Sequence, residues 1–422
     1  MSSTDVDRPS HLGTVYSVYT LPCKASKKVD AVDPIRNPYT PNAGASPPQL
    51  AGRDDIIEEF QIILRRIASG KTEKGLIVTG LRGVGKTVLL GTFEALAKEE
   101  RAVVVKHECA KSPGEFTRKL PALTHRALLE VSPKSRWQER AKIAAGVLQG
   151  FKGHYDPEGR WSVSYERPSM EAERLTGDFV TDLPDLMEAL GAAAAEAGRI
   201  VAFLVDEIQF LESDELSALV MAKHRINQRG LPIVLAGAGL PQLPNLTAEA
   251  QTYAERMFRW PEIGRLGSEA AAEALVTPAQ GEGVEYADAA VRLILEYTEG
   301  YPYFLQEYGK AAWDVAEDTT ITESDVLEAK QDVEDALDRD FFSLRVGGLS
   351  PRDLDYVKAL ASLGPGEHAP GDIATAMGKK SSSQIGSWTQ RLTQRGLIYS
   401  SRRGRVAFTV PHFERYVERA NL

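Results

Sequence analysis

Short apolar runs alternate with amphipathic helical patterns along the chain from about residue 50 to residue 264. Apolar runs of strand length occur at residues 75–79, 101–107, 200–205 and 232–236. Apolar residues at three- and four-residue spacing predict helices at 56–67, 87–98, 113–131, 181–197 and 214–228. Strands that alternate with helices favour a parallel sheet covered by helices, which is an α/β fold.

The pattern changes after Gly264, where we expect helices and no further strands. Four helical segments are predicted at 268–275, 287–297, 302–315 and 323–337. Near the C-terminus, helices are predicted at 351–363, 370–377 and 382–394, followed by alternating stretches at 397–399 and 406–410. Three helices followed by a β-hairpin is the order typical of a winged helix-turn-helix.

These patterns divide the chain into four parts. Pro, Ser and Asn residues without apolar periodicity predict an extended, partly disordered leader over residues 1–48. The remaining parts are an α/β core at 49–266, a helical lid at 267–340 and a winged-helix domain at 341–422. We interpret residues 132–168 as an insertion in the core, with a hairpin turn at Asp156-Pro157-Glu158-Gly159.

Composition narrows the class of protein. With 422 residues, 43% of them apolar, the chain can bury the cores of two or three domains. Cys23 and Cys109 are far apart and have no His or Cys at metal-ligand spacing, so neither a disulfide framework nor a zinc site is supported. No secretory signal and no run of about 18 uncharged apolar residues is present. We therefore expect a cytoplasmic protein without a membrane partner.

One Gly-rich segment, between a predicted strand and a predicted helix, carries specific chemistry. It consists of Gly80, Leu81, Arg82, Gly83, Val84, Gly85, Lys86 and Thr87, followed by Val88, and fits the pattern G-x-x-x-x-G-K-[ST]. Backbone N–H groups of such a loop cradle phosphates, and the helix N-terminus adds partial positive charge. We expect Lys86 to neutralise the β and γ oxygens of ATP and Thr87 to ligate Mg²⁺. The alternative is a Gly-rich turn with a surface lysine.

Two acidic residues end the third apolar run, where a parallel sheet binds its ligands. Asp206 suits the coordination shell of Mg²⁺. Glu207 is placed to orient or deprotonate the water that attacks the γ-phosphate. The alternative is that the pair only caps the helix that starts near Asp214.

The order of this loop, Asp206-Glu207, a helical lobe and a winged helix resembles the AAA+ P-loop ATPases over roughly residues 45–422. Leu50-Ala51-Gly52-Arg53 and Gly300-Tyr301-Pro302 are similar to motifs of the origin-recognition-complex-like and signal-transduction clades. The resemblance implies that Pro302 packs toward the nucleotide base. It also implies that Arg256 is an arginine finger, which completes the active site of a neighbouring copy in a homo-oligomer. A surface ion pair is the alternative for Arg256.

The chain departs from this family at two positions. Relatives have a polar sensor residue where this chain has Gly237-Ala238-Gly239, so Gln242, Gln209 or backbone groups are the remaining candidates. No arginine occurs in 300–306, where Tyr301 and Tyr303 contribute either to the nucleotide site or to the lobe core. ATP hydrolysis could therefore be slow or partner-dependent. The second hypothesis is a nucleotide-gated switch or scaffold with little turnover that binds a protein partner.

Charge is distributed unevenly along the chain. The net charge is −9, yet residues 350–422 hold eleven Lys or Arg and six Asp or Glu. Lys379 and Lys380 precede the predicted recognition helix, and Arg402, Arg403 and Arg405 crowd the predicted wing. Such groups favour binding to double-stranded DNA, with docking of a protein on the winged helix as the alternative.

Overall fold

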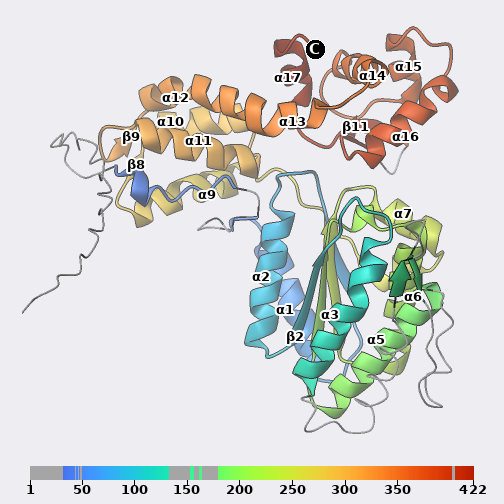
Figure 1. The fold of residues 1–422 in the computed structure, drawn as a ribbon. Coiled ribbons are helices and arrows are strands. Elements are labelled where there is room, and N and C mark those ends of the chain that lie inside the picture. The colour runs from blue at the N-terminus through green and yellow to red at the C-terminus, as the bar shows by residue number, and fades with distance from the viewer. Residues whose placement is uncertain are drawn as a thin grey trace, which may run out of the picture.

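The computed structural model describes residues 32–42, 44–45, 47, 50–132, 153–155, 161–163, 179–401 and 404–422. The α/β core lies below, the lid (267–340) lies above one side of it, and the C-terminal domain (341–422) lies above the other (Figure 1). Within the described part of the chain, no helix combines the length and the apolar character needed to cross a membrane.

The core contains a parallel sheet of five strands in the order β2-β5-β6-β1-β7. Its strands are β1 (Gly75–Thr79), β2 (Val103–Glu108), β5 (Val201–Asp206), β6 (Ile233–Gly239) and β7 (Phe258–Arg259). Every residue of β1, β5 and β6 is buried, which explains why these strands are continuous apolar runs in the sequence. The predicted α/β fold is confirmed.

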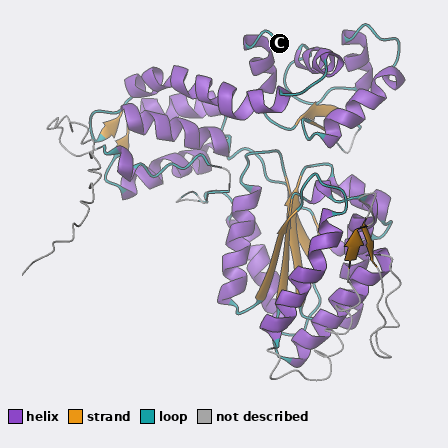
Figure 2. Ribbon diagram, viewed as in Figure 1, coloured by secondary structure: helices purple, strands orange, loops and turns teal. Residues whose placement is uncertain are grey.

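Helices cover both faces of the sheet (Figure 2). They are α1 (Asp54–Ala68) and α2 (Lys86–Glu99) on one face, and α3 (Glu115–Val131), α5 (Phe179–Glu196) and α6 (Ser213–Arg229) on the other. Ala202 and Leu204 of β5 pack on the α1 and α2 side, whereas Phe203 and Val205 pack on the opposite side. This division follows from the alternation of side chains along a strand.

Some elements of the core were not predicted. Helices α7 (Leu243–Ala250) and α8 (Ala254–Met257) connect β6 to β7. By contrast, strands β3 (Gly153–Tyr155) and β4 (Trp161–Val163) pair in antiparallel register on either side of the residues where the sequence predicts a hairpin turn. Nearly all of the predicted insertion beyond these two strands, including the Asp156–Gly159 turn, lies outside the described residues.

The lid contains the four predicted helices, α9 (Ser268–Gly281), α10 (Asp288–Thr298), α11 (Pro302–Val315) and α12 (Glu323–Ala336). The expectation of no further strands is wrong, because β8 (Glu285–Tyr286) pairs in parallel with β9 (Thr320–Ile321). Strands of two residues are too short to produce a periodic pattern. Beyond α12, a π-helical turn, η5 (Leu337–Phe342), continues into α13 (Ser343–Val346).

Residues 32–42, part of the predicted leader, pack along the lid. Tyr39 is buried, and its hydroxyl donates a hydrogen bond to the carbonyl of Leu275. The indole N–H of Trp313 donates to the carbonyl of Asp33 at 3.1 Å. Isolated anchors of this kind leave no periodic signal in a sequence, although they fix the segment in place.

The C-terminal domain has the predicted order of three helices and a hairpin. Its elements are α14 (Pro351–Ala361), α15 (Pro370–Ala376), η6 (Ser382–Ile385), α16 (Gly386–Gln394), β10 (Ile398–Ser400) and β11 (Val406–Phe408), followed by α17 (Phe413–Arg419), which was not predicted. In α17, Phe413 is buried and packs against Phe342 of the π-helical turn. The last helix thus attaches the domain to the end of the lid.

We predict that Gly300→Ala destabilises the protein more than Gly283→Ala. Both glycines have positive φ angles, +71° and +79°, which cost an alanine roughly 1–2 kcal/mol. A Cβ at Gly300 would also lie 2.4 Å from the carbonyl oxygen of Leu266, whereas a Cβ at Gly283 meets nothing within 4 Å. Urea denaturation should show a clearly larger loss of unfolding free energy for Gly300→Ala. Equal losses would contradict the close approach of the lid to Leu266.

Candidate functional site

The Gly-rich loop joins β1 to α2 at the upper edge of the sheet. Gly83 and Gly85 have φ angles of +81° and +93°, in the left-handed region that glycine adopts without strain. At Gly80, a Cβ would lie 2.3 Å from the carbonyl oxygen of Ile263, so only glycine fits. Helix α2 begins at Lys86, directly after Gly85. The shape of this loop and the helix terminus that follows it fit the anion site that the sequence predicts.

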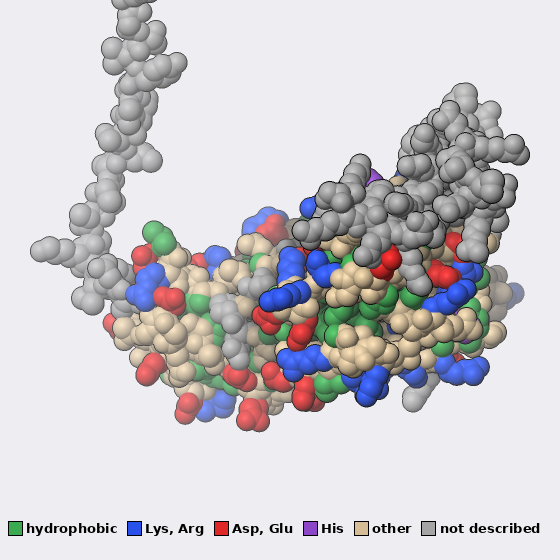
Figure 3. All heavy atoms as spheres, turned by 90° about the horizontal axis from the view of Figure 1, so that it is seen from below, with side chains coloured by type: hydrophobic (Ala, Val, Ile, Leu, Met, Phe, Trp, Pro, Cys, Tyr) green, Lys and Arg blue, Asp and Glu red, His purple; other side chains and the backbone are tan. Residues whose placement is uncertain are grey.

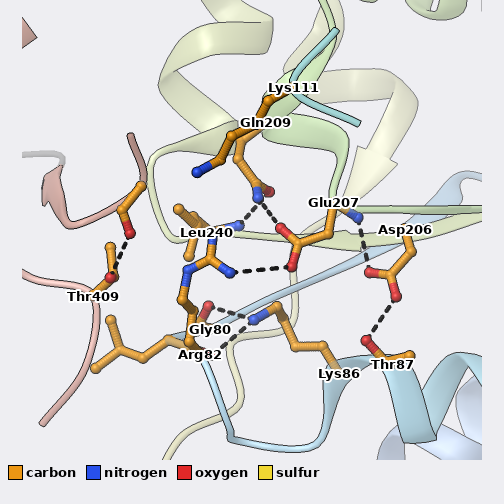
Figure 4. Close-up of polar contacts among 12 residues, drawn as sticks. Gly80, Arg82, Lys86, Thr87, Lys111, Asp206, Glu207, Gln209, Leu240 and Thr409 are labelled. Atoms are coloured by element: carbon orange, nitrogen blue, oxygen red, sulfur yellow. Dashed lines mark hydrogen bonds and ion pairs between the residues drawn. The ribbon is translucent and has the colours of Figure 1, made fainter. Parts of the chain in front are cut away.

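Lys86 lies at the centre of this loop (Figure 4). Its Nζ donates to the carbonyls of Gly80 at 3.0 Å and Leu81 at 2.7 Å. Burial lowers the pKa of Lys86 to about 8, and the nearby carboxylates of Glu207 and Asp206 oppose this shift. The ammonium is held where it can reach phosphate oxygens bound by the loop.

Thr87 and Asp206 meet across the sheet edge. The Thr87 hydroxyl donates to Asp206 Oδ2 at 2.7 Å, and the backbone N–H of Glu207 donates to Oδ1 at 2.8 Å. Burial raises the pKa of the Asp206 carboxyl, and the hydrogen bond from Thr87 opposes the rise. A hydroxyl and a carboxylate side by side provide the hard oxygen ligands that Mg²⁺ prefers. Thr87 and Asp206 thus fit the predicted metal site.

Glu207 has a left-handed backbone with φ of 52°, which is uncommon for a residue other than glycine and recurs at functional sites. Its carboxylate accepts a hydrogen bond from the Gln209 amide and lies 3.7 Å from a guanidinium nitrogen of Arg82. Gln209 in turn accepts a hydrogen bond from the backbone N–H of Leu240 at 3.1 Å. Arg82 of the phosphate loop and Gln209 therefore hold this carboxylate, and the backbone that follows β6 holds Gln209 (Figure 4).

The absence of a polar side chain at Gly239 has a steric explanation. A Cβ at this position would lie 2.5 Å from the Gln209 amide oxygen and 2.4 Å from Leu243 Cδ1. Of the two glutamines named as sensor candidates, Gln209 contacts Glu207 and Gln242 is buried, and neither lines the cavity described next.

A cavity of about 990 Å³ opens above the loop. Its walls come from the phosphate loop, from leader residues 40–42, 44, 45 and 47, from Pro302 and Gln306 of the lid, and from Arg345 and residues 395–397 of the C-terminal domain. Its volume is at the upper end of the range for small-molecule sites. Tyr301 is buried in the lid, yet its ring lies 3.2 Å from a Cβ placed on Gly83, so it belongs to the lobe core and also abuts the loop.

The C-terminal domain rests directly on this loop. The backbone N–H of Arg82 donates to the carbonyl of Thr409 at 3.1 Å, and Lys111 Nζ donates to the carbonyl of Arg395 at 2.7 Å. A Cβ at Gly396 would lie 2.8 Å from a guanidinium nitrogen of Arg82. Sequence reasoning treated Arg82 only as a loop residue, because its contacts to residues 396 and 409 have no local signal.

Comparison with known protein families identifies most of the α/β core. Residues 49–235 match the AAA ATPase domain family. They form an AAA ATPase domain. Residues 339–417 match a domain of unknown function (DUF8462). No curated protein matched the chain.

Solved structures share the arrangement at low sequence identity. The Walker-type ATPase PABY2304 of Pyrococcus abyssi is 15% identical, with 87% of this chain and 97% of that chain covered and a TM-score of 0.53. Aeropyrum pernix Orc1, solved in complex with DNA, is 16% identical, with coverages of 92% and 96% and a TM-score of 0.44. The Thermotoga maritima RuvB Holliday junction branch migration motor is 16% identical, with coverages of 89% and 97% and a TM-score of 0.42. The similarity to PABY2304 supports the fold described above.

Arg256 lies far from the phosphate loop of its own AAA ATPase domain. It is exposed on α8, which leads into β7. Phe258 of β7 aligns with Gly75, the first residue of β1, whereas the phosphate loop follows the last residue of β1. Arg256 therefore lies near the opposite edge of the sheet, and any contact with a phosphate would have to be made in another copy.

Three of the predicted DNA-contacting residues, Lys379, Lys380 and Arg405, are described and belong to the C-terminal domain. Lys379 and Lys380 are exposed ahead of η6, and Arg405 is exposed with its guanidinium bound to the carbonyl of Glu367 at 2.9 Å. Arg402 and Arg403 lie outside the described residues. On the underside of the molecule, basic and acidic side chains are interspersed (Figure 3).

We predict that Lys86→Met changes the pH dependence of stability in the nucleotide-free protein. The lysine has a pKa of about 8 in the folded state, against an ordinary value of 10.5, so the unfolded chain binds more protons between these two values. Wild-type unfolding free energy should therefore rise relative to the variant by on the order of 2–3 kcal/mol from pH 8 to pH 10.5. Urea denaturation at several pH values measures this difference.

Lys71→Met is the matched control, because Lys71 is exposed. Its unfolding free energy should follow the wild-type pH profile. A Lys86→Met profile parallel to the wild type would show that burial does not perturb Lys86.

Proposed function

We propose that this chain is an ATPase that hydrolyses ATP with Mg²⁺ and couples turnover to movement of its C-terminal domain, which engages double-stranded DNA. One observation carries the proposal. Lys86, Thr87 and Glu207 line a cavity whose opposite wall is the C-terminal domain, and Asp206 accepts a hydrogen bond from Thr87 beside it. A change in the contents of this cavity would act directly on that domain.

Each residue of the site has a separate role in the proposed ATP hydrolysis. Lys86 and the loop N–H groups bind the phosphates, and Thr87 and Asp206 hold Mg²⁺, which neutralises charge that develops on the phosphate oxygens. Glu207 orients the attacking water and takes up its proton. Arg82 and Gln209 both contact the Glu207 carboxylate. Arg82 and Gln209 therefore compete with the attacking water for the Glu207 carboxylate. This competition supports ATP hydrolysis that is slow or depends on a partner.

We predict that Glu207→Gln retains ATP binding and reduces turnover by at least about 100-fold, because the amide cannot accept a proton. Lys86→Ala should lose both binding and turnover. Phosphate release and nucleotide titration at fixed low salt measure the two properties separately.

Glu108→Gln is the matched control, because Glu108 also lines the cavity but is exposed at the end of β2. It should keep wild-type turnover. If the wild-type protein binds ATP tightly and does not turn over with or without DNA, the nucleotide-gated switch with a protein partner becomes the better description.

Exposed basic and hydrogen-bonding side chains on the C-terminal domain support the DNA part of the proposal. Lys379 and Lys380 precede η6, and the side chains of Ser383, Gln384 and Gln390 are exposed on η6 and α16. We infer that α14, α15, α16 and the β10–β11 hairpin act as a winged helix. In this arrangement α16 faces the major groove of the DNA, and the β10–β11 turn faces the DNA backbone.

We predict that replacing Lys379 and Lys380 with alanine weakens DNA binding and lowers its dependence on salt. Each lost phosphate contact should reduce the log–log salt slope by about 1, because fewer counterions are released. Arg402, Arg403 and Arg405 form a second set for the same test, and Lys98→Ala, on an exposed face of α2, is the control. DNA binding independent of salt and of both sets would favour a protein partner.

A homo-oligomer follows from the same proposal if Arg256 acts on a neighbouring copy. Turnover should then rise with protein concentration, and Arg256→Ala should abolish that rise. Concentration-independent turnover unaffected by Arg256→Ala would leave Arg256 as a surface residue.

A further inference from the structure

Arg345 is a cation of the nucleotide cavity that lies outside the AAA ATPase domain. It is on α13, directly after the π-helical turn, and it lines the cavity. Its guanidinium lies 4.1 Å from the centroid of the Phe341 ring, and Phe341 stacks on Tyr303 with centroids 4.5 Å apart. A Cβ on Gly83 would lie 3.1 Å from Tyr303 Cβ. This stack of rings therefore connects the guanidinium to the phosphate loop.

The π-helical turn determines the direction in which Arg345 faces. A π-helical turn adds one residue to a helical turn, which rotates the following helix by about 100° relative to an uninterrupted α-helix. π-Helical insertions are frequent at functional sites. Here the insertion lies between α12 of the lid and Arg345, so it directs an arginine into the cavity.

Two carboxylates close to Arg345 in the sequence or bound to the Tyr303 of its ring stack already have partners. Asp340 accepts two hydrogen bonds from Arg339, at 3.1 and 3.0 Å, and Glu307 is bound to the Tyr303 hydroxyl. Within the described ranges, no carboxylate forms an ion pair with Arg345. Burial lowers the pKa of Arg345 to about 10, and the neighbouring charge of Arg82 adds to this shift.

A half-buried guanidinium beside a second cation is unfavourable until an anion joins it. The cavity lining supports an anionic ligand, because it includes six cations and three carboxylates in the described residues. Arg82 and Lys111 lie in the same region and feel the charge of Arg345. Arg82 also approaches Glu207, which identifies this region as the end of the cavity where hydrolysis would occur.

We propose that Arg345 contacts the terminal phosphate of the bound nucleoside triphosphate, and that this contact ties the position of the C-terminal domain to the presence of that phosphate. The inference rests on the proposed ATP site. Residues 300–306 of the lid contain no arginine, and Arg345 lies at the joint between the lid and the C-terminal domain. Arg345 lies at the start of the C-terminal domain, and only residues 347–350 separate α13 from α14, so movement of Arg345 passes directly to the remaining helices of that domain.

The test compares affinities for a non-hydrolysable ATP analogue and for ADP. Arg345→Gln should weaken binding of the ATP analogue by roughly ten- to hundredfold, the range for a lost charge-assisted contact. ADP affinity should stay within about twofold, because ADP lacks the contacted phosphate. Arg345→Lys should restore part of the loss, since it keeps the charge without the two-pronged geometry.

Arg352→Gln is the matched control, because Arg352 is exposed on α14 and does not line the cavity. It should change neither affinity. Equal losses for both nucleotides, or an unchanged preference for the ATP analogue in Arg345→Gln, would overturn the contact. Failure of the wild-type protein to bind either nucleotide would instead refute the proposed ATP site, and the contact with it.

Small-angle X-ray scattering of the full chain tests the link to the C-terminal domain. The ATP analogue and ADP should give different distance distributions in the wild-type protein and the same distribution in Arg345→Gln at saturating nucleotide. A nucleotide-dependent difference that persists in Arg345→Gln would overturn the coupling.

Discussion

The hydrogen bond between Thr87 and Asp206 joins the two segments from which the rest of the site is built. It forms because β1 and β5 both run parallel to the intervening β6, so their carboxyl ends reach the same edge of the sheet. Lys86 precedes Thr87 on the same helix, and Glu207 follows Asp206 on the same strand end. A slip in the alignment of β5 would separate all four groups. The buried faces of β1, β5 and β6 prevent such a slip, because a shift of one residue exchanges the two faces of a strand.

The sequence alone predicts what depends on local pattern. The phosphate loop is a contiguous motif, and the apolar run that ends in Asp206-Glu207 identifies the second half of the site. Contacts of Arg82 with Glu207 and Thr409 join residues more than 100 positions apart, so no spacing rule predicts them. Arg345 was missed for the same reason. Its sequence context resembles a helix end, and only the π-helical turn directs it toward the cavity.

The lid and the C-terminal domain are joined by charge as well as by aromatic packing. Glu299, at the end of α10, accepts contacts from Arg265 at the base of the lid and from Arg415 of α17, the latter at 2.9 Å. Arg265 and Arg415 thus share one carboxylate. Movement of either body requires this carboxylate to lose a partner. Since exposed ion pairs contribute little individually, the joint can rearrange at small free-energy cost.

One wall of the cavity is formed by the leader, which is attached to the lid, whereas the floor of the cavity belongs to the AAA ATPase domain. Residues 33–39 are anchored on the lid through Tyr39 and Asp33, and residues 40–42, 44, 45 and 47 line the cavity. The floor belongs to the AAA ATPase domain. A rotation of the lid would therefore move one wall relative to the floor and change the shape of the cavity. Ligand affinity and lid orientation are then thermodynamically linked, so a mutation in a segment remote from the phosphate loop can alter how tightly that loop retains its ligand.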